Sequence, residues 1–143
     1  MLKIRHTGLY VNNLESMKDF YCRFFDMSVA SYSVESGKYL ETLVATEGVI
    51  ANIYKLQCDD KTMLELIHPR DIDTKSVHSP SVTRLGCMHL AFTVNDLWSL
   101  YGRMKNEGVE FLSEPLDSPD GNVHVCFCKD PEGNYLELVE ELK

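Results

Sequence analysis

The feature that most constrains the fold is an internal repeat. The segment His6–Met17 can be laid over His89–Leu100, with His, Val, Asn, Leu and Ser at coinciding positions. A second echo links Met63–Ile67 to Tyr135–Val139. Two similar modules in one chain predict an internally duplicated domain whose halves share one topology.

Each repeat reads as a strand, a helix and then further strands. β-Forming residues predict first strands at Ile4–Val11 and Gly86–Val94, each followed by an Asn or Asp that can cap a helix. Apolar residues at helical spacing predict helices over Leu14–Phe25 and Leu97–Asn106. The later strands are expected at Tyr39–Thr46, Val49–Gln57 and Thr62–His68, and at Val109–Leu112, Val123–Lys129 and Asn134–Glu140. The predicted fold class is therefore α+β, built from two βαβββ modules.

The length of 143 residues favours one domain with a sizeable buried core. We expect this domain to span residues 1–143, with module 1 at about 1–70 and module 2 at about 83–143. The polar stretch at about 69–82, with its two prolines, is predicted to be the linker.

The net charge of −8 and the pI of about 5.0 argue against nucleic-acid partners and anionic membranes, because both are bound through clustered Lys and Arg. No signal peptide or membrane span is visible, which favours a cytosolic protein. The five cysteines form no CxxC motif and are expected to be small buried apolar residues rather than zinc ligands.

Four polar residues repeat between the modules. His6 and His89 stand in the first strand of each module, and Glu65 and Glu137 stand between leucines in the last strand. Because neighbouring strand residues point to opposite faces, each Glu lies on the face opposite its flanking leucines. A single His or Glu in a strand is commonly only structural. Four at duplicated positions can instead form a site for Zn, Ni, Fe, Mn or Co.

The remaining histidines are not echoed between the modules. His68, His78 and His124 are therefore interpreted as surface or rim residues. His124 follows an Asp-Gly-Asn turn and could line the mouth of a pocket.

These residues resemble the vicinal oxygen chelate superfamily, which includes glyoxalase I, methylmalonyl-CoA epimerase, extradiol dioxygenases and the bleomycin and fosfomycin resistance proteins. The resemblance covers nearly the whole chain. It is carried by His6–Val11 with Asp19–Tyr21, by Leu64–Leu66, by Met88–Val94 and by the Asp-Pro-Glu-Gly-Asn turn that leads into Tyr135–Leu138.

The resemblance implies paired βαβββ modules that form a cupped mixed sheet around one divalent metal ion, with His6, Glu65, His89 and Glu137 as ligands. It further implies a homodimer, with the site inside one chain or shared between two. The His/Glu/His/Glu set is similar to bacterial glyoxalase I and related epimerases. The implied activity is that of a lyase or isomerase that removes a proton next to a carbonyl and passes through an enediolate on the metal. Glu137 is the expected principal base and Glu65 the second base.

One departure concerns the substrate. Glutathione-dependent lyases of this type carry an Arg four residues after the first His and an Asn four residues after the first Glu, and Tyr10 and Pro69 stand there. The usual glutathione contacts are thus not visible, which favours another small carbonyl or cyclitol-type substrate. The alternative functions are an extradiol-type dioxygenase and a non-catalytic protein that binds a small molecule or confers resistance.

Overall fold

The computed structural model describes residues 1–72 and 81–142. The chain divides into two compact units, Met1–Lys75 (unit 1) and Ser76–Lys143 (unit 2). Each unit contains one four-stranded mixed sheet with helices, so the predicted α+β class is confirmed. The middle of the predicted linker, together with His78, lies outside the described residues.

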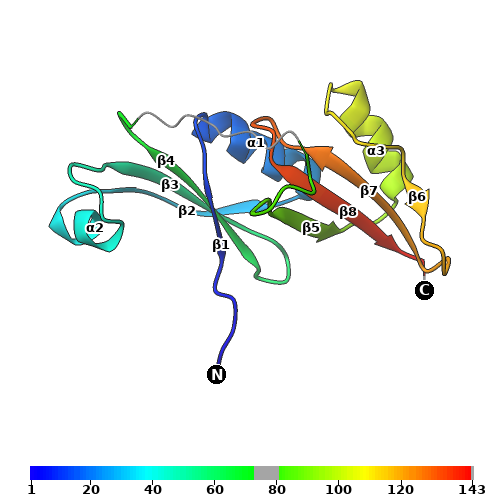
Figure 1. Cartoon of the computed structure of the whole chain (residues 1–143), viewed down its shortest axis with the longest axis horizontal. Helices are drawn as coiled ribbons and strands as arrows, with labels where there is room; N and C mark the ends of the chain where they lie inside the picture. The colour runs from blue at the N-terminus through cyan, green and yellow to red at the C-terminus, as the bar shows by residue number, and fades with distance from the viewer. Residues whose placement is uncertain (73–80, 143) are drawn as a thin grey trace. The chain divides into compact units, whose positions relative to one another are not determined.

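Unit 1 begins with β1 (Thr7–Tyr10) and α1 (Leu14–Phe25). The chain continues through β2 (Ser28–Glu35), α2 (Lys38–Leu43), β3 (Ala51–Gln57) and β4 (Met63–Pro69). The strand order is β1-β4-β3-β2, with β1 parallel to β4 and the other pairs antiparallel (Figure 1). The first and last strands of the module therefore lie side by side at one edge.

Unit 2 repeats this arrangement. It consists of β5 (His89–Thr93), α3 (Leu97–Asn106), β6 (Leu116–Asp117), β7 (Val123–Lys129) and β8 (Tyr135–Glu141). The strand order is β5-β8-β7-β6, and β5 is again parallel to β8. The two sheets thus have the same topology, as the internal repeat predicts.

Both long helices begin and end where the sequence predicts. Asn13 caps α1 by accepting a hydrogen bond from the Ser16 N–H, and Asp96 caps α3 by accepting one from the Ser99 N–H. These side chains satisfy N–H groups that have no partner inside the helix. Gly108, with φ of +86°, follows the end of α3 in the left-handed conformation that glycine adopts without strain.

The apolar stripe of each helix packs on its own sheet. Leu64 and Leu66 of β4 are buried on the side of unit 1 that carries α1, and Leu136 and Leu138 of β8 are buried in the same way in unit 2. We call this side of each sheet the helix face and the opposite side the ligand face. The buried helix residues are Leu14, Met17, Phe20, Tyr21 and Phe24 in α1 and Leu97, Leu100, Tyr101 and Met104 in α3.

The connection between the first helix and β3 differs from the prediction. The predicted strand Tyr39–Thr46 is wrong, because Lys38–Leu43 forms the helix α2. The strand at this place in the module is β2, Ser28–Glu35, which is absent from the predicted elements. Leu40 of α2 packs with Val49, Ala51, Ile53 and Ile67 in a small core. This packing outweighs the β-forming character of the segment.

The matching connection in unit 2 also differs. The predicted strand Val109–Leu112 is wrong, since Phe111 makes only an isolated bridge to Cys128. The short strand β6 lies further along, where Leu116 and Asp117 pair with the start of β7. No helix within the described residues is long and apolar enough to cross a membrane.

Candidate metal centre

In unit 1, strand pairing places His6 next to Glu65 on the ligand face. Glu65 lies in the middle of β4 and pairs in register with Gly8 of β1. His6 precedes Gly8 by two residues, so its side chain points to the same face of the sheet. Its Nε2 lies 3.3 Å from Oε2 of Glu65, whose side chain is only 13% exposed. The two predicted ligands of module 1 are therefore brought together.

Unit 2 contains the same pair at the same register. Glu137 of β8 pairs with Ala91 of β5, and His89 precedes Ala91 by two residues. The His89 Nε2 lies 3.2 Å from Oε2 of Glu137, whose side chain is 27% exposed. Duplication of the fold has thus duplicated the geometry of a His–Glu pair as well as its residue types.

The separation of each pair fits two neighbouring ligands of a metal ion. A charge-assisted N–H···O hydrogen bond is typically shorter, about 2.7–2.9 Å. Two ligand atoms that each lie about 2.1 Å from a metal are about 3.0 Å apart at a right angle and about 3.4 Å apart at a tetrahedral angle. The distances of 3.3 and 3.2 Å fall between these limits. Imidazole nitrogen with carboxylate oxygen is also a donor set that suits Zn, Ni, Co, Mn and Fe.

Among the described residues, no group of three or more His, Cys, Asp or Glu side chains is gathered where it could hold a metal ion. The predicted ligands are instead present as two pairs, one in each unit. That His6, Glu65, His89 and Glu137 act together on one ion stays a prediction.

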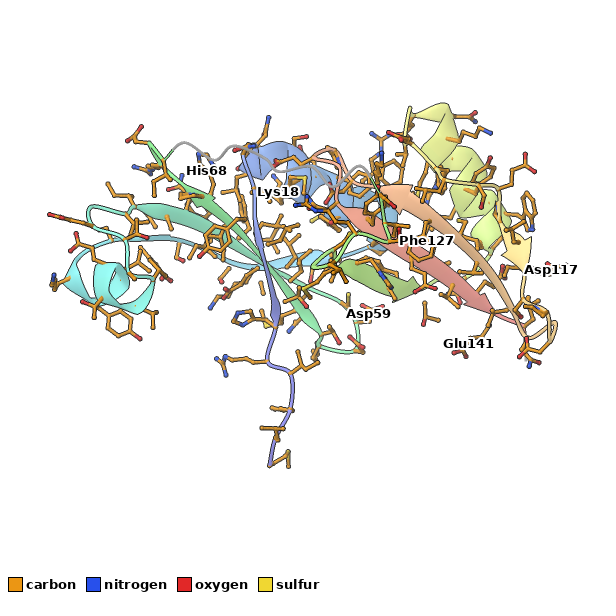
Figure 2. All side chains as sticks on the ribbon, viewed as in Figure 1. Lys18, Asp59, His68, Asp117, Phe127 and Glu141 are labelled. Carbon is orange, nitrogen blue, oxygen red and sulfur yellow. The ribbon has the colours of Figure 1, made fainter. Side chains whose placement is uncertain are left out.

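The surroundings of the two glutamates differ at one register position. In unit 1, Lys55 of β3 stands opposite Glu65, and its Nζ lies 3.2 Å from Oε1 of Glu65. In unit 2, the residue opposite Glu137 is Phe127 of β7, labelled in Figure 2. The Phe127 ring meets the His89 ring edge to face, with centroids 5.2 Å apart. No motif in the sequence marks either residue, although the repeat that aligns the last strands of the modules also aligns Lys55 with Phe127.

Apolar residues stand beside the pair in unit 1. Ile67 lies two residues after Glu65, and Ile53 lies two residues before Lys55, so both share the ligand face. Leu40 of α2 covers them. The ligand face of unit 1 therefore combines a charged end at His6, Glu65 and Lys55 with an apolar end under α2.

His68 has a structural role in unit 1. It lies on the helix face of β4, and its Nδ1 is 2.9 Å from the carbonyl oxygen of Val11. Because a carbonyl oxygen only accepts hydrogen bonds, Nδ1 carries the proton. His68 thus ties the end of β4 to the chain that leaves β1.

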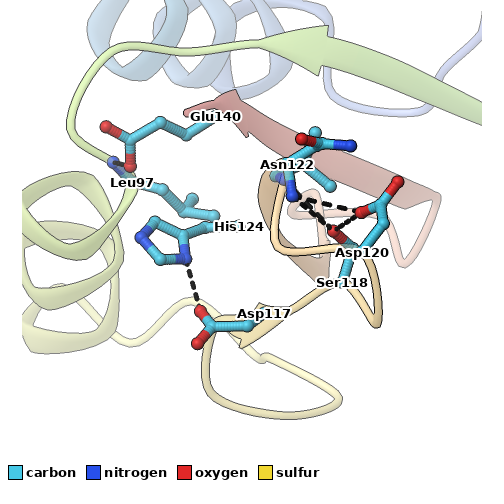
Figure 3. A network of polar contacts seen from close by, with 8 residues as sticks. Leu97, Asp117, Ser118, Asp120, Asn122, His124 and Glu140 are labelled. Carbon is cyan, nitrogen blue, oxygen red and sulfur yellow. Dashed lines mark hydrogen bonds and ion pairs between the residues drawn. The ribbon is translucent and has the colours of Figure 1, made fainter. Parts of the chain in front are cut away.

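His124 lies on the helix face of β7 and not on the ligand face that carries Glu137, and its place at a pocket mouth stays a prediction. Its side chain points to the opposite face of β7 from that of Phe127 and shares the helix face with Cys126. Its Nδ1 is 2.6 Å from Oδ1 of Asp117, as Figure 3 shows. In the same region, the carboxylate of Glu140 accepts hydrogen bonds from the backbone N–H groups of Asp96 and Leu97. This group of residues stabilises the start of α3 and the β6–β7 connection.

The cysteines are all free, and the expectation of burial is met by Cys126 and Cys128, whereas Cys22, Cys58 and Cys87 are only partly buried. Burial raises the pKa of the Cys126 thiol to about 11 and that of Cys128 to about 12. Both thiols stay protonated at neutral pH and pack on the helix face of β7, as expected for small apolar residues.

The comparisons with known proteins agree with this architecture. The family model of the glyoxalase/bleomycin resistance protein/dioxygenase superfamily matches residues 3–138. A lactoylglutathione lyase of Neisseria meningitidis is 26% identical, over 98% of this chain and 91% of its own length. A probable lactoylglutathione lyase of Synechocystis is 24% identical, over 94% and 92%. The lactoylglutathione lyase of Schizosaccharomyces pombe is 25% identical, and this chain spans 47% of its length.

Solved structures show the same fold. A glyoxalase family protein from Bacillus cereus superposes with a TM-score of 0.91 at 20% identity, covering 100% of this chain and 96% of that protein. Glyoxalase I from Zea mays superposes with a TM-score of 0.70 at 19% identity, covering 98% of this chain and 47% of that protein. With the family model matching nearly all of the sequence, this chain belongs to the glyoxalase/bleomycin resistance protein/dioxygenase superfamily.

Proposed function

We propose that this protein is a divalent-metal-dependent lyase or isomerase that removes a proton from carbon next to a carbonyl group. The observation that carries the proposal is the duplicated His–Glu pair, at 3.3 Å in unit 1 and 3.2 Å in unit 2. In the proposed site His6, Glu65, His89 and Glu137 hold one ion, either within one chain or between two chains of a homodimer. The ion would be Ni, Zn, Co, Mn or Fe.

The bound metal would supply Lewis acidity, which stabilises negative charge on the two neighbouring oxygens of the substrate. The protein's own residues do the remaining chemistry. His6 and His89 would hold the ion through a ring nitrogen. Glu137 takes the proton from carbon and returns it to the same or a neighbouring carbon. Glu65 is the second base, used where the proton returns on the opposite face, as in an epimerase.

The membership of the family and the names of the relatives support a lyase-type reaction, and the substrate is a proposal of its own. Tyr10 and Pro69 stand where glutathione-dependent lyases carry their Arg and Asn. We therefore propose a small carbonyl or vicinal-oxygen substrate without glutathione, acted on in the cytosol.

The test compares metal content and proton exchange in matched variants. After chelator treatment and reconstitution, the wild type should hold about one divalent ion per chain and exchange the substrate proton in deuterated water. Substrate candidates are 2-oxo acids, CoA thioesters, hemithioacetals and cyclitols. Glu65→Ala with Glu137→Ala should abolish both properties. Glu47→Ala with Glu114→Ala, which removes two exposed carboxylates outside the strands, should preserve both. A wild type without bound metal would reject the proposal.

A further inference from the structure

The two oxygens of Glu65 have different partners. Oε2 faces His6 at 3.3 Å, while Oε1 lies 3.2 Å from the ammonium group of Lys55. The carboxylate is well covered, with 13% of its side chain exposed, and the Lys55 side chain is 37% exposed. One oxygen is thus available on the side of His6, and the other is engaged by a cation.

Lys55 is held at this place by the sheet itself. It pairs with Glu65 of β4 on one side and with Ser31 of β2 on the other. A residue in an inner strand has its Cα and the direction of its side chain fixed by both neighbours. The approach of the ammonium group to Glu65 is therefore a consequence of strand register.

Among the described residues of unit 2, this contact has no counterpart. Phe127 occupies the position opposite Glu137 and packs against His89. Within the part of the chain that the structure describes, the ion-pair partner of Glu137 is His89, and no Lys or Arg lies within ion-pair distance of it. The Glu137 side chain is also about twice as exposed as that of Glu65. The two carboxylates are thus alike in position and different in restraint.

We propose that Lys55 is a positioning residue that holds one oxygen of Glu65 and so makes Glu65 a fixed, one-oxygen metal ligand, leaving Glu137 as the carboxylate that is free to move. This inference rests on the proposed function and assigns different tasks to its two bases. A carboxylate held between an ammonium group and an imidazole has few lone pairs left for a substrate proton. Glu137 can rotate away from His89 without breaking a contact to a lysine.

The assignment has a stereochemical consequence for the reaction. With Glu65 restrained, the proton is taken and returned by Glu137 on one face of the substrate. The lysine therefore favours a lyase or an isomerase that transfers the proton on one face over an epimerase that needs a base on each face.

The test uses Co²⁺ as the probe and requires no substrate. Lys55→Met removes the ammonium group and keeps an apolar stem of similar length, and Lys55→Arg retains a cationic donor. Affinity is measured by chelator competition, and the number of oxygen ligands by X-ray absorption on the loaded protein. Lys55→Met should raise the affinity for Co²⁺ on the order of tenfold, because a cation that competes for Glu65 is gone. It should also add one oxygen ligand, as Oε1 becomes free to bind. Lys55→Arg should match the wild type in both measurements.

Unit 2 offers the reciprocal experiment. Phe127→Lys introduces an ammonium group beside Glu137, and Phe127→Met controls for loss of the ring. Relative to Phe127→Met, the lysine variant should bind Co²⁺ about tenfold more weakly. Phe127→Lys should also lose proton exchange with whichever substrate the wild type processes, because the new ammonium group would restrain Glu137 as Lys55 restrains Glu65.

The outcomes separate this inference from the proposed function. If the wild type binds one ion and Lys55→Met leaves affinity and coordination unchanged, or weakens binding, the role of Lys55 is refuted and the metal site stands. A rise in affinity without a new oxygen ligand also refutes positioning, because it reports charge repulsion alone. A wild type that binds no Co²⁺ overturns both ideas.

Discussion

Units 1 and 2 share strand order, helix caps and a His–Glu pair at matching register, and they differ in what surrounds the glutamate. Unit 1 places a lysine beside Glu65 and covers part of the ligand face with α2. Unit 2 places an aromatic ring beside its histidine. Its β6 strand has two residues, against eight in β2. The strand pairing common to both units fixes the positions of the potential ligands. Residues that differ between the units can then give ligands at equivalent positions different roles.

The largest difference between the two units is expected when the charge of each carboxylate is removed separately. Glu137→Gln should lower proton exchange at the substrate carbon by about 10²- to 10⁴-fold, the usual contribution of a general base. Glu65→Gln should reduce exchange less than Glu137→Gln does, because the proposed role of Glu65 is that of a ligand held by Lys55. Exchange is measured by deuterium incorporation under saturating metal. Equal losses in the two variants would show that the units are functionally equivalent.

The second prediction concerns the buried leucines beside the ligands. Leu66 and Leu138 are fully buried at matching positions in β4 and β8. Substituting either by Ala should lower the free energy of unfolding by about 2–5 kcal/mol, because a cavity is left in the core. Val34→Ala, in an exposed position of β2, should change it by less than about 1 kcal/mol. Urea denaturation followed by circular dichroism measures all three. A large effect at one leucine alone would mean that the two cores are not equivalent.

The third prediction uses the thiols of unit 2, which stand where unit 1 has Tyr54 and Leu56. Burial raises the pKa of Cys126 to about 11 and that of Cys128 to about 12, from the ordinary value of 9.0. Because the folded state favours the protonated thiols, their contribution is complete below pH 9. It is lost progressively as the pH rises toward 11 and 12.

The slope of this loss should be on the order of 1 kcal/mol per pH unit for each thiol. Urea denaturation at pH values from about 8 to about 10.5 measures this loss of unfolding free energy. Fluorescence of the single tryptophan, Trp98 of α3, reports unfolding of unit 2. Cys126→Val with Cys128→Val should flatten the pH dependence relative to the wild type. An unchanged slope in this variant would assign the alkaline loss to other groups.

The smallest effect is expected at the helix caps. Asn13→Ala and Asp96→Ala each remove one acceptor for a backbone N–H and should cost about 1 kcal/mol of unfolding free energy. Asp96 has φ of 50°, a conformation that glycine adopts freely. Asp96→Gly should therefore lower the unfolding free energy less than Asp96→Ala does. Asn13 has φ of −111°, so substitution by glycine relieves no backbone strain there. The same cost for both Asp96 variants would argue against backbone strain at that cap.

The sequence predicted best those elements whose local signals agree. Capping residues and apolar periodicity coincide at α1 and α3, so both ranges matched the structure. Alternation around Glu65 and Glu137 located β4 and β8 to within a residue. The His–Glu pairs were recognised because residue type and repeat position coincided. In each case the information lies within a few residues of the element.

The elements that were predicted wrongly depend on distant contacts. The residues around Tyr39 have β-forming side chains. They become helical because Leu40 packs against residues of β3 and against Val49, which precedes that strand. Ser28–Glu35 is rich in serine and lacks a regular alternation, so its strand signal is weak and the strand depends on pairing with β3. Lys55 belongs to no motif, because its contact with Glu65 depends on the register between β3 and β4.

Metal stoichiometry in variants that lack the His–Glu pair of one unit shows whether the two pairs bind one ion or two. In the proposed function, the two His–Glu pairs together hold one ion. Wild type should therefore bind about one divalent ion per chain. His6→Ala with Glu65→Ala, and separately His89→Ala with Glu137→Ala, should each lower the affinity by at least about 100-fold while the fold is retained. Two ions per chain in the wild type, with one ion retained in each variant, would contradict a shared site and show that each pair is a site of its own.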